Sequence, residues 1–267
     1  MQSFQYYIKT NVVFGEGSVC RTAELVKKHG GSRVLVVYGG QSAKKSGLLD
    51  KVLALLDGAG ISHQELGGVQ PNPRLSLVRE GIALCRREGV EMILAVGGGS
   101  VIDSAKGIAA GVCYDGDVWD CYTGKAPVAA ALPLGVVLTI PAAGSECSDV
   151  SVVTRPDSHD KRSFHAAAVT PRFAIIAPDL FTTLPRNQIA NATVDVISHV
   201  MERFFSDSSH VTFTDRLCIA TMETAMQLGL WLYDHPDDVD AWAEFALTAN
   251  IAHNGVLGQG RVEDWGA

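Results

Sequence analysis

The sequence lacks the features that mark several broad classes of protein. Its six cysteines form no CxxC pair and no dense framework, so we expect free thiols in a reducing compartment. Lys and Arg are scattered and the formal net charge is −7, so nothing in the chain would attract a nucleic acid. The amino terminus has neither the basic start nor the apolar run of a secretory signal. These absences argue against a disulfide scaffold and a nucleic-acid-binding protein, and we expect a cytoplasmic protein.

Long unbroken apolar runs are also missing. One uncharged stretch, Ala126 to Ser145, is long enough to span a bilayer, but prolines 127, 133 and 141 and Gly135 interrupt it. We expect it to be a loop that enters a buried strand, and we expect no contact with a membrane. The 267 residues are 47% hydrophobic and 19% charged, which is ample for a buried core.

Short apolar runs alternate with helical segments in the first part of the chain. The runs are rich in Val, Ile and Leu and cover residues 33–40, 91–100, 134–143 and 173–180. Residues 48–60 and 74–89 have apolar side chains at helical spacing and a glycine near the end. Strands that alternate with helices favour a parallel sheet covered on both faces. We therefore predict a Rossmann-like α/β domain over residues 1–185.

The character of the sequence changes after Pro185. No strand-like run follows, and three segments have the composition of successive helices: 187–205, 214–234 and 239–255. We predict that an all-helical domain begins at residue 186 and is incomplete at residue 267.

The stretch AVGGGSVIDSAK, residues 95–106, follows a predicted strand and opens a predicted helix. Three glycines let the backbone turn tightly and approach a ligand, and Ser100 and Asp103 lie where the helix begins. Free N–H groups at such a start favour a phosphate. The spacing is not GxGxxG, and a glycine-rich cap is often only structural. A simple turn needs one glycine, however, so the triple glycine favours a pyrophosphate site.

A second glycine-containing turn, YGGQSAKKSG, follows the first predicted strand, where an α/β sheet commonly holds the ribose of a dinucleotide. An acid at this place would repel an added phosphate. The turn instead offers room, a hydroxyl group and positive charge through Gly39, Gly40, Gln41, Ser42, Lys44 and Lys45. This composition favours NADP over NAD, although a solvated turn would contain the same residues.

A third loop, PAAGSECSDVSVV at residues 141–153, also follows a strand and contains Gly144 and Ser145. Ligands of open α/β sheets bind at the carboxyl edge of the strands. Three such loops together indicate a ligand more strongly than any one of them. Lys161 and His165 come next and could be surface residues without a role.

The segment TVDVISH places Asp195 and His199 four residues apart on a predicted helix, where both side chains share one face. Such a pair could bind a divalent metal, but a hydrogen bond on the helix surface is the more common reason for this spacing. Two protein ligands rarely complete a metal site. Among the other histidines, only His253 lies in another predicted helix of this part with an apolar flank.

The order of these motifs resembles one family, the iron-containing (group III) alcohol dehydrogenases. The resemblance covers essentially the whole chain and is nearest to the butanol-dehydrogenase-like branch of NADPH-dependent aldehyde reductases. The matching segments are FGEGS (14–18), PNP (71–73), GGGSVIDSAK (97–106), TIPAAGSECS (139–148), DKRSFH (160–165), ATVDVISHVME (192–202) and NGVLGQGRVEDW (254–265).

The resemblance implies a cofactor site and a metal site. The implied pyrophosphate-binding residues are Gly98, Gly99, Ser100 and Asp103, with Thr139, Ser145, Asn72 and Lys161 along the cofactor cleft. Gly39 occupies the position where NAD-preferring relatives carry an aspartate, and Ala143 stands where many relatives have threonine. Asp195 and His199 match the first two metal ligands, and the other two ligands of the family lie beyond Ala267.

These implications describe an oxidoreductase that transfers a hydride between NADP(H) and an alcohol or aldehyde at an Fe²⁺ or Zn²⁺ site. We expect this 267-residue form to be catalytically weak, with uncovered apolar surface after residue 186, and to form a homodimer as the family does. Two alternatives stay open. One is a non-enzymatic dinucleotide-binding module. The other is a relative of glycerol dehydrogenase or dehydroquinate synthase, and the matches at residues 192–202 and 254–265 argue against it.

Overall fold

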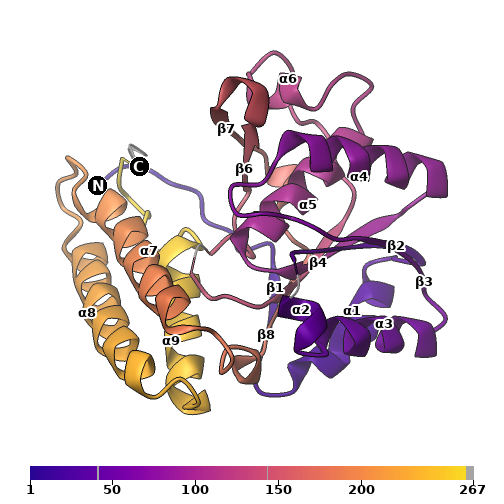
Figure 1. The fold of residues 1–267 in the computed structure, drawn as a ribbon. Helices are drawn as coiled ribbons and strands as arrows, with labels where there is room; N and C mark the ends of the chain where they lie inside the picture. Colours follow the sequence, from indigo (N-terminus) through magenta and orange to yellow (C-terminus); the bar gives the residue numbers. More distant parts are fainter. Residues whose placement is uncertain (41, 143, 263–267) are drawn as a thin grey trace. The chain divides into compact units, whose positions relative to one another are not determined.

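The computed structural model describes residues 1–40, 42–142 and 144–262, which form two compact units (Figure 1). Unit 1 comprises Met1–Ile8, Ile140–Ser148 and Ala177–Ala267. Unit 2 comprises Lys9–Thr139 and Asp149–Ile176. The units interleave along the chain, because two short segments, 1–8 and 140–148, belong with the carboxyl-terminal helices.

Unit 2 is built, within the described residues, on a sheet of six parallel strands in the order β1-β8-β5-β4-β2-β3. Its strands are β1 (Asn11–Phe14), β2 (Arg33–Tyr38), β3 (Ser62–Leu66), β4 (Met92–Gly97), β5 (Leu134–Leu138) and β8 (Phe173–Ile176). Its helices are η1 (Ser18–Arg21), α1 (Thr22–Lys28), α2 (Ser42–Lys45), α3 (Leu48–Gly58), α4 (Leu75–Glu88), α5 (Gly99–Val112), α6 (Trp119–Tyr122), η2 (Pro156–Ser158) and η3 (Ala167–Val169).

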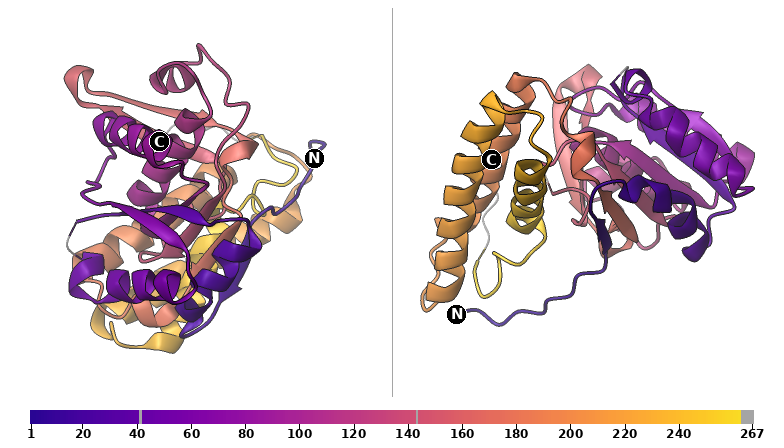
Figure 2. Two further views of the ribbon diagram at one scale, coloured as in Figure 1. Left: turned by 90° about the vertical axis from the view of Figure 1, so that its right-hand side faces the viewer. Right: turned by 90° about the horizontal axis from the view of Figure 1, so that it is seen from below.

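Helices cover both faces of this sheet. Figure 1 shows α4 and α5 on one face and α1 and α3 on the other, and Figure 2 shows the same layers from two further sides. Every residue of β4 and β5 is buried, as expected for central strands of a covered parallel sheet. The predicted α/β class is therefore confirmed, and the four predicted strands correspond to β2, β4, β5 and β8.

Four strand segments have no counterpart in the sequence-based prediction. β1 is only four residues long, and Val13 is its one buried residue. β3 lies at the sheet edge, where only Leu66 is buried, so its side chains show no apolar run. β6 (Val150–Arg155) and β7 (Asp160–His165) form a separate antiparallel hairpin in the same unit. The uncharged stretch before β5 is a loop that enters this buried strand, as predicted. Among the described residues, no helix combines the length and the apolar character needed to cross a membrane.

Unit 1 is helical. Its elements are η4 (Pro178–Leu180), α7 (Arg186–Phe204), α8 (Thr212–Asp234) and α9 (Val239–His253). The three long helices coincide with the three predicted ones and pack against one another (Figure 2). Trp242 of α9 is fully buried. Apolar side chains remain exposed in this unit: Val194 on α7 is 63% exposed, Phe205 directly after α7 is 74% exposed, and Leu230 on α8 is 75% exposed. The expectation of uncovered apolar surface after residue 186 is confirmed.

Candidate functional site

The triple glycine forms the turn between β4 and α5. Gly98 is the residue before the helix, and Gly99 and Ser100 are in its first turn, where backbone N–H groups have no partner one turn earlier. A Cβ atom on Gly97 would lie 2.4 Å from Cγ2 of Val101, so only glycine lets the strand pass this close to the helix. Gly98, Gly99 and Ser100, three of the four predicted pyrophosphate-binding residues, are partly exposed.

The ends of β2 and β5 flank this turn on the same edge of the sheet. The Thr139 amide, directly after β5, donates to the Gly97 carbonyl at 3.2 Å. On the other side, a Cβ atom on Gly39 would lie 3.7 Å from Val101, an ordinary contact. Gly39 therefore has room for a side chain. The structure thus brings together three predicted cofactor segments from three neighbouring strands of unit 2.

The turn after β2 is open to solvent. Gly40 and Ser42 are exposed, and Ser42 begins the short helix α2. The ammonium group of Lys44 lies 5.0 Å from the ring centre of Tyr38, and a hydrogen bond that it donates to the Tyr38 side chain raises the pKa of Lys44. Lys44 therefore keeps its positive charge. Gln41 and Ala143, which the sequence analysis singled out, lie outside the described residues.

Asp103 and Lys106, further along α5, bind the β6–β7 hairpin. The carboxylate of Asp103 accepts a hydrogen bond from the Val152 amide at 3.1 Å. The buried ammonium group of Lys106 donates to the Val150 carbonyl at 2.9 Å. The sequence motif therefore has a structural task that its spacing did not indicate, and the predicted role of Asp103 at a pyrophosphate stays a prediction.

Asn72 and Lys161 are both exposed and are linked through the hairpin. Asn72 adopts a left-handed backbone conformation, with φ of 55°, in the turn before α4. The carbonyl of the next residue, Pro73, accepts from the Thr154 amide at 2.7 Å, and Thr154 pairs with Lys161 across the two strands. Asn72 and Lys161 are 89 positions apart in the sequence (161 − 72), and these contacts bring them into one region of unit 2.

Asp195 and His199 lie on one face of α7, as their spacing predicts. His199 Nε2 and Asp195 Oδ1 are 4.0 Å apart, and the two side chains are 21% and 45% exposed. Burial lowers the pKa of His199 and Arg203 adds to this effect, while Asp195 acts in the opposite direction. The imidazole is therefore held in its neutral form, which is the form that binds metal ions.

His253, at the end of α9, lies directly beside this pair. Its ring centre is 4.5 Å from that of His199, with the ring planes tilted by 50°. The one histidine that the sequence analysis placed in another helix of this part is therefore a neighbour of the pair. Among the described residues, however, no group of three or more His, Cys, Asp or Glu side chains is arranged to hold a metal ion.

The loop of residues 140–148 belongs to the same unit as these histidines. Ser145 is buried, and the Ser148 amide donates to its carbonyl at 3.4 Å. Glu146 is 2% exposed and accepts a hydrogen bond from Asn250 at 2.7 Å. Neither residue of this contact could be predicted from the sequence, because they are 104 positions apart and no periodic pattern joins them.

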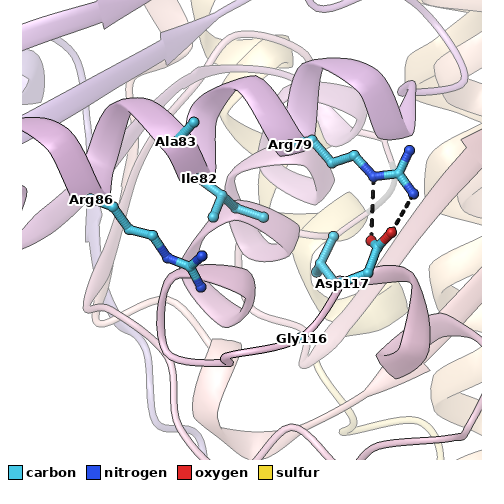
Figure 3. Close-up of a pocket in the computed structure, with 7 residues that line it drawn as sticks. Arg79, Ile82, Ala83, Arg86, Gly116 and Asp117 are labelled. Carbon is cyan, nitrogen blue, oxygen red and sulfur yellow. Dashed lines mark hydrogen bonds and ion pairs between the residues drawn. The ribbon is translucent and has the colours of Figure 1, made fainter.

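A hollow of about 260 Å³ on unit 2 lies outside the predicted cofactor and metal residues (Figure 3). Its lining residues are Arg79, Ile82, Ala83, Arg86, Gly116, Asp117 and Val118. Burial tends to raise the pKa of Asp117, but hydrogen bonds from Arg79 and the Trp119 amide outweigh it and the pKa is lowered. Arg86 donates to the carbonyls of Gly111 and Tyr114. These pairings hold the segment after α5 in place, and no predicted site residue lines the hollow.

Comparison with known proteins decides the family. Residues 9–178 match the family described as iron-containing alcohol dehydrogenase. The chain belongs to this family. Its members include a Bacillus subtilis protein described as a probable NADH-dependent butanol dehydrogenase, which is 42% identical over 99% of this chain and 68% of its own length. The Escherichia coli NADPH-dependent aldehyde reductase YqhD is 36% identical over 99% of this chain and 68% of its own length.

A solved structure agrees with this assignment. The NADH-dependent butanol dehydrogenase A of Thermotoga maritima superposes with a TM-score of 0.96 and 40% identity, over 98% of this chain and 66% of that protein. The chain therefore spans about two thirds of the length of these family members. The resemblance in motif order that the sequence showed is confirmed, including its nearness to the butanol dehydrogenase and aldehyde reductase members.

Proposed function

We propose that this chain serves an oxidoreductase that transfers a hydride between NADP(H) and an alcohol or aldehyde at a divalent metal site, working mainly as an aldehyde reductase. The observation that carries the proposal is the half-buried Asp195–His199 pair on α7 in a member of the iron-containing alcohol dehydrogenase family. Such a pair supplies one carboxylate and one neutral imidazole, which are ligands that Fe²⁺ and Zn²⁺ both accept.

The cofactor half of the proposal uses the edge of the sheet in unit 2. N–H groups of Gly98, Gly99 and Ser100 at the start of α5 would bind the pyrophosphate. In unit 2 the other proposed contacts are Asp103, Thr139, Asn72 and Lys161. The cofactor contact expected of Ser145, which belongs to unit 1, stays a prediction.

The preference for NADP over NAD rests on the turn after β2. Gly39 and Gly40 leave space and no negative charge beside the ribose, while Ser42 adds a hydroxyl group and Lys44 a positive charge. The relatives include proteins described as NADH-dependent and one described as NADPH-dependent, so the turn, not the family, supports this preference.

The metal half uses Asp195 and His199. A bound divalent ion supplies Lewis-acid polarisation of the substrate oxygen, and the nicotinamide supplies or accepts the hydride. Asp195 provides negative charge, and burial keeps His199 free of a proton so that its nitrogen can coordinate. Two donors bind far more weakly than the four of a complete site, so we propose weak metal binding and low activity for the 267 residues as they stand.

Metal content and NADPH-dependent reduction of butyraldehyde test the proposal on the purified chain, after its intact mass confirms the end at Ala267. We expect NADPH to bind more tightly than NADH, with a low content of metal and little turnover. A full equivalent of metal with rapid turnover would contradict the proposed weakness of the metal site. Failure to bind either dinucleotide would contradict the proposed cofactor.

A non-enzymatic dinucleotide-binding module is the second candidate. The glycine-rich turn and the strand ends that flank it belong to unit 2, whereas the Asp195–His199 pair belongs to unit 1, and this separation favours it. Tight NADPH binding with no metal and no turnover at any metal concentration would select it.

A homodimer is the proposed assembly, which the molar mass in solution tests.

A further inference from the structure

The loop of residues 140–148 is joined to α9 by buried side chains. Nδ2 of Asn250 donates to Oε1 of Glu146 at 2.7 Å and contacts Sγ of Cys147 at 3.2 Å. Glu146 is 2% exposed and Asn250 is 6% exposed. All three residues belong to unit 1, so this connection lies within one compact unit.

The hydrogen bonds continue beyond the end of α9. Nδ2 of Asn254 donates to Oδ1 of Asn250 at 3.2 Å, and Oδ1 of Asn254 accepts from the Val256 amide at 3.1 Å. The three side chains of Glu146, Asn250 and Asn254 therefore form a continuous relay, which we call the clamp. It runs from the loop to the turn that follows the helix.

The backbone of the loop also presses directly on His253. Gly144 has φ of 60°, and a Cβ atom at this position would lie 2.4 Å from Cβ of His253. The ring of His253 in turn lies 4.5 Å from that of His199. Within unit 1, the loop that carries Ser145 is thus in contact with His253, and His253 is in contact with the proposed metal pair.

A carboxyl group is an expensive choice for a position that is 2% exposed, because its desolvation must be offset by donors. Packing alone would be served as well by an apolar side chain of similar volume. We infer that Glu146 is a positioning residue: acting through Asn250, it holds the Ser145 loop against the helix end that carries His253. It thereby sets the spacing between the Ser145 loop and the Asp195–His199 pair, an inference that rests on the proposed function.

Three variants of the full chain test the inference. Glu146→Ala removes the acceptor of the Asn250 hydrogen bond, and Glu146→Gln keeps a side-chain oxygen for Asn250. Thr248→Val is the control: it removes a buried hydroxyl of α9 that donates to the Glu244 carbonyl and is outside the clamp. The measurements are the Kd of NADPH by fluorescence, the Kd of Co²⁺ by visible absorption, and hydrogen exchange of peptides covering 144–148 and 250–256.

We expect Glu146→Ala to weaken both Kd values about tenfold, in the range of supporting groups around metal sites. Glu146→Gln and Thr248→Val should remain close to the wild type. In Glu146→Ala, both peptides should exchange faster together, while α8 keeps its protection.

The exchange measurement separates this inference from the proposed function. If the wild-type chain binds neither NADPH nor Co²⁺, the proposed function fails, and coupled exchange of the two peptides still decides whether the clamp exists. Unchanged exchange at 250–256 in Glu146→Ala would overturn the inference. Equal losses in Thr248→Val, or faster exchange throughout the helices, would also overturn it, because they would indicate a general loss of stability.

Discussion

The start of α5 in unit 2 and the Asp195–His199 pair in unit 1 differ in which groups would bind the ligand. At α5 the groups are backbone N–H groups, and one strand, turn and helix supply them within a short stretch of sequence. On α7 the groups are side chains, and a metal ion needs further donors from other helices. A backbone site is therefore complete wherever its segment folds, whereas a side-chain site depends on residues far away in the sequence.

Removing one metal donor should have the largest effect on this comparison. We expect His199→Ala to weaken Co²⁺ binding roughly 100-fold and to leave the Kd of NADPH unchanged, because the loss of even a supporting group costs about 10- to 100-fold. The control is His63→Ala, since His63 lies 3.5 Å from Asp57 in a pair outside the proposed site. Titration with Co²⁺ measures the Kd of each variant. An equal loss of Co²⁺ affinity in His199→Ala and His63→Ala would show that the α7 pair has no special role.

A substitution in the backbone site at the start of α5 should weaken the binding of NADPH and leave the binding of Co²⁺ unchanged. In Gly97→Ala the new Cβ atom would overlap Val101, so the start of α5 must move. We expect a destabilisation of about 1–3 kcal/mol, typical of overpacking, and a rise in the Kd of NADPH of about tenfold, with Co²⁺ binding unchanged. Gly39→Ala is the matched control, because its Cβ atom meets only ordinary contacts at 3.7 Å. Urea unfolding and fluorescence titration measure both quantities.

A charge at the turn after β2 should change the choice of cofactor and not the fold. Gly39→Asp places a carboxylate where the proposed 2′-phosphate binds, and repulsion between like charges should weaken NADPH about tenfold relative to NADH. Gly39→Asn has nearly the same shape without the charge and should lose less. The measurement is the ratio of the Kd of NADPH to the Kd of NADH in each variant. The same ratio in Gly39→Asp and Gly39→Asn would remove the argument for NADP.

The smallest effect concerns pH and unit 2. Burial lowers the pKa of His29, and the charges of Lys28 and Arg172 add to this effect. The unfolded chain, with a histidine pKa of about 6.5, therefore takes up a proton before the folded chain does. The stability contribution is present above pH about 6.5 and is lost as the pH falls to the lower pKa of the folded state.

Urea unfolding between pH 7.5 and pH 5 measures this loss of stability, because this range extends on both sides of the ordinary histidine pKa of about 6.5. His29→Gln should flatten the dependence. His165→Gln, on the exposed face of β7, is the control and should leave it as it is. A wild-type curve with the same slope as that of His29→Gln would contradict the assignment to His29.

The elements that the sequence predicted well are those with strong local patterns. β4 and β5 are fully buried and therefore apolar along their whole length, and α7, α8 and α9 repeat apolar residues at helical spacing. β3 escaped prediction because its edge position buries only Leu66. The predicted site residues are local features as well: the glycines of the β4–α5 turn and the i, i+4 pair on α7 lie where their spacing predicts, and their roles stay predictions.

The sequence by itself determined the α/β class, the helical second part, the glycine-rich turn and the Asp195–His199 pair, because each depends on neighbours within a few residues. The tertiary structure alone decided that Asp103 and Lys106 bind the hairpin, that His253 lies against His199, and that Glu146 accepts from Asn250. These contacts join residues 44 to 104 positions apart. Only the packing of whole elements brings such residues together, and no local periodicity records it.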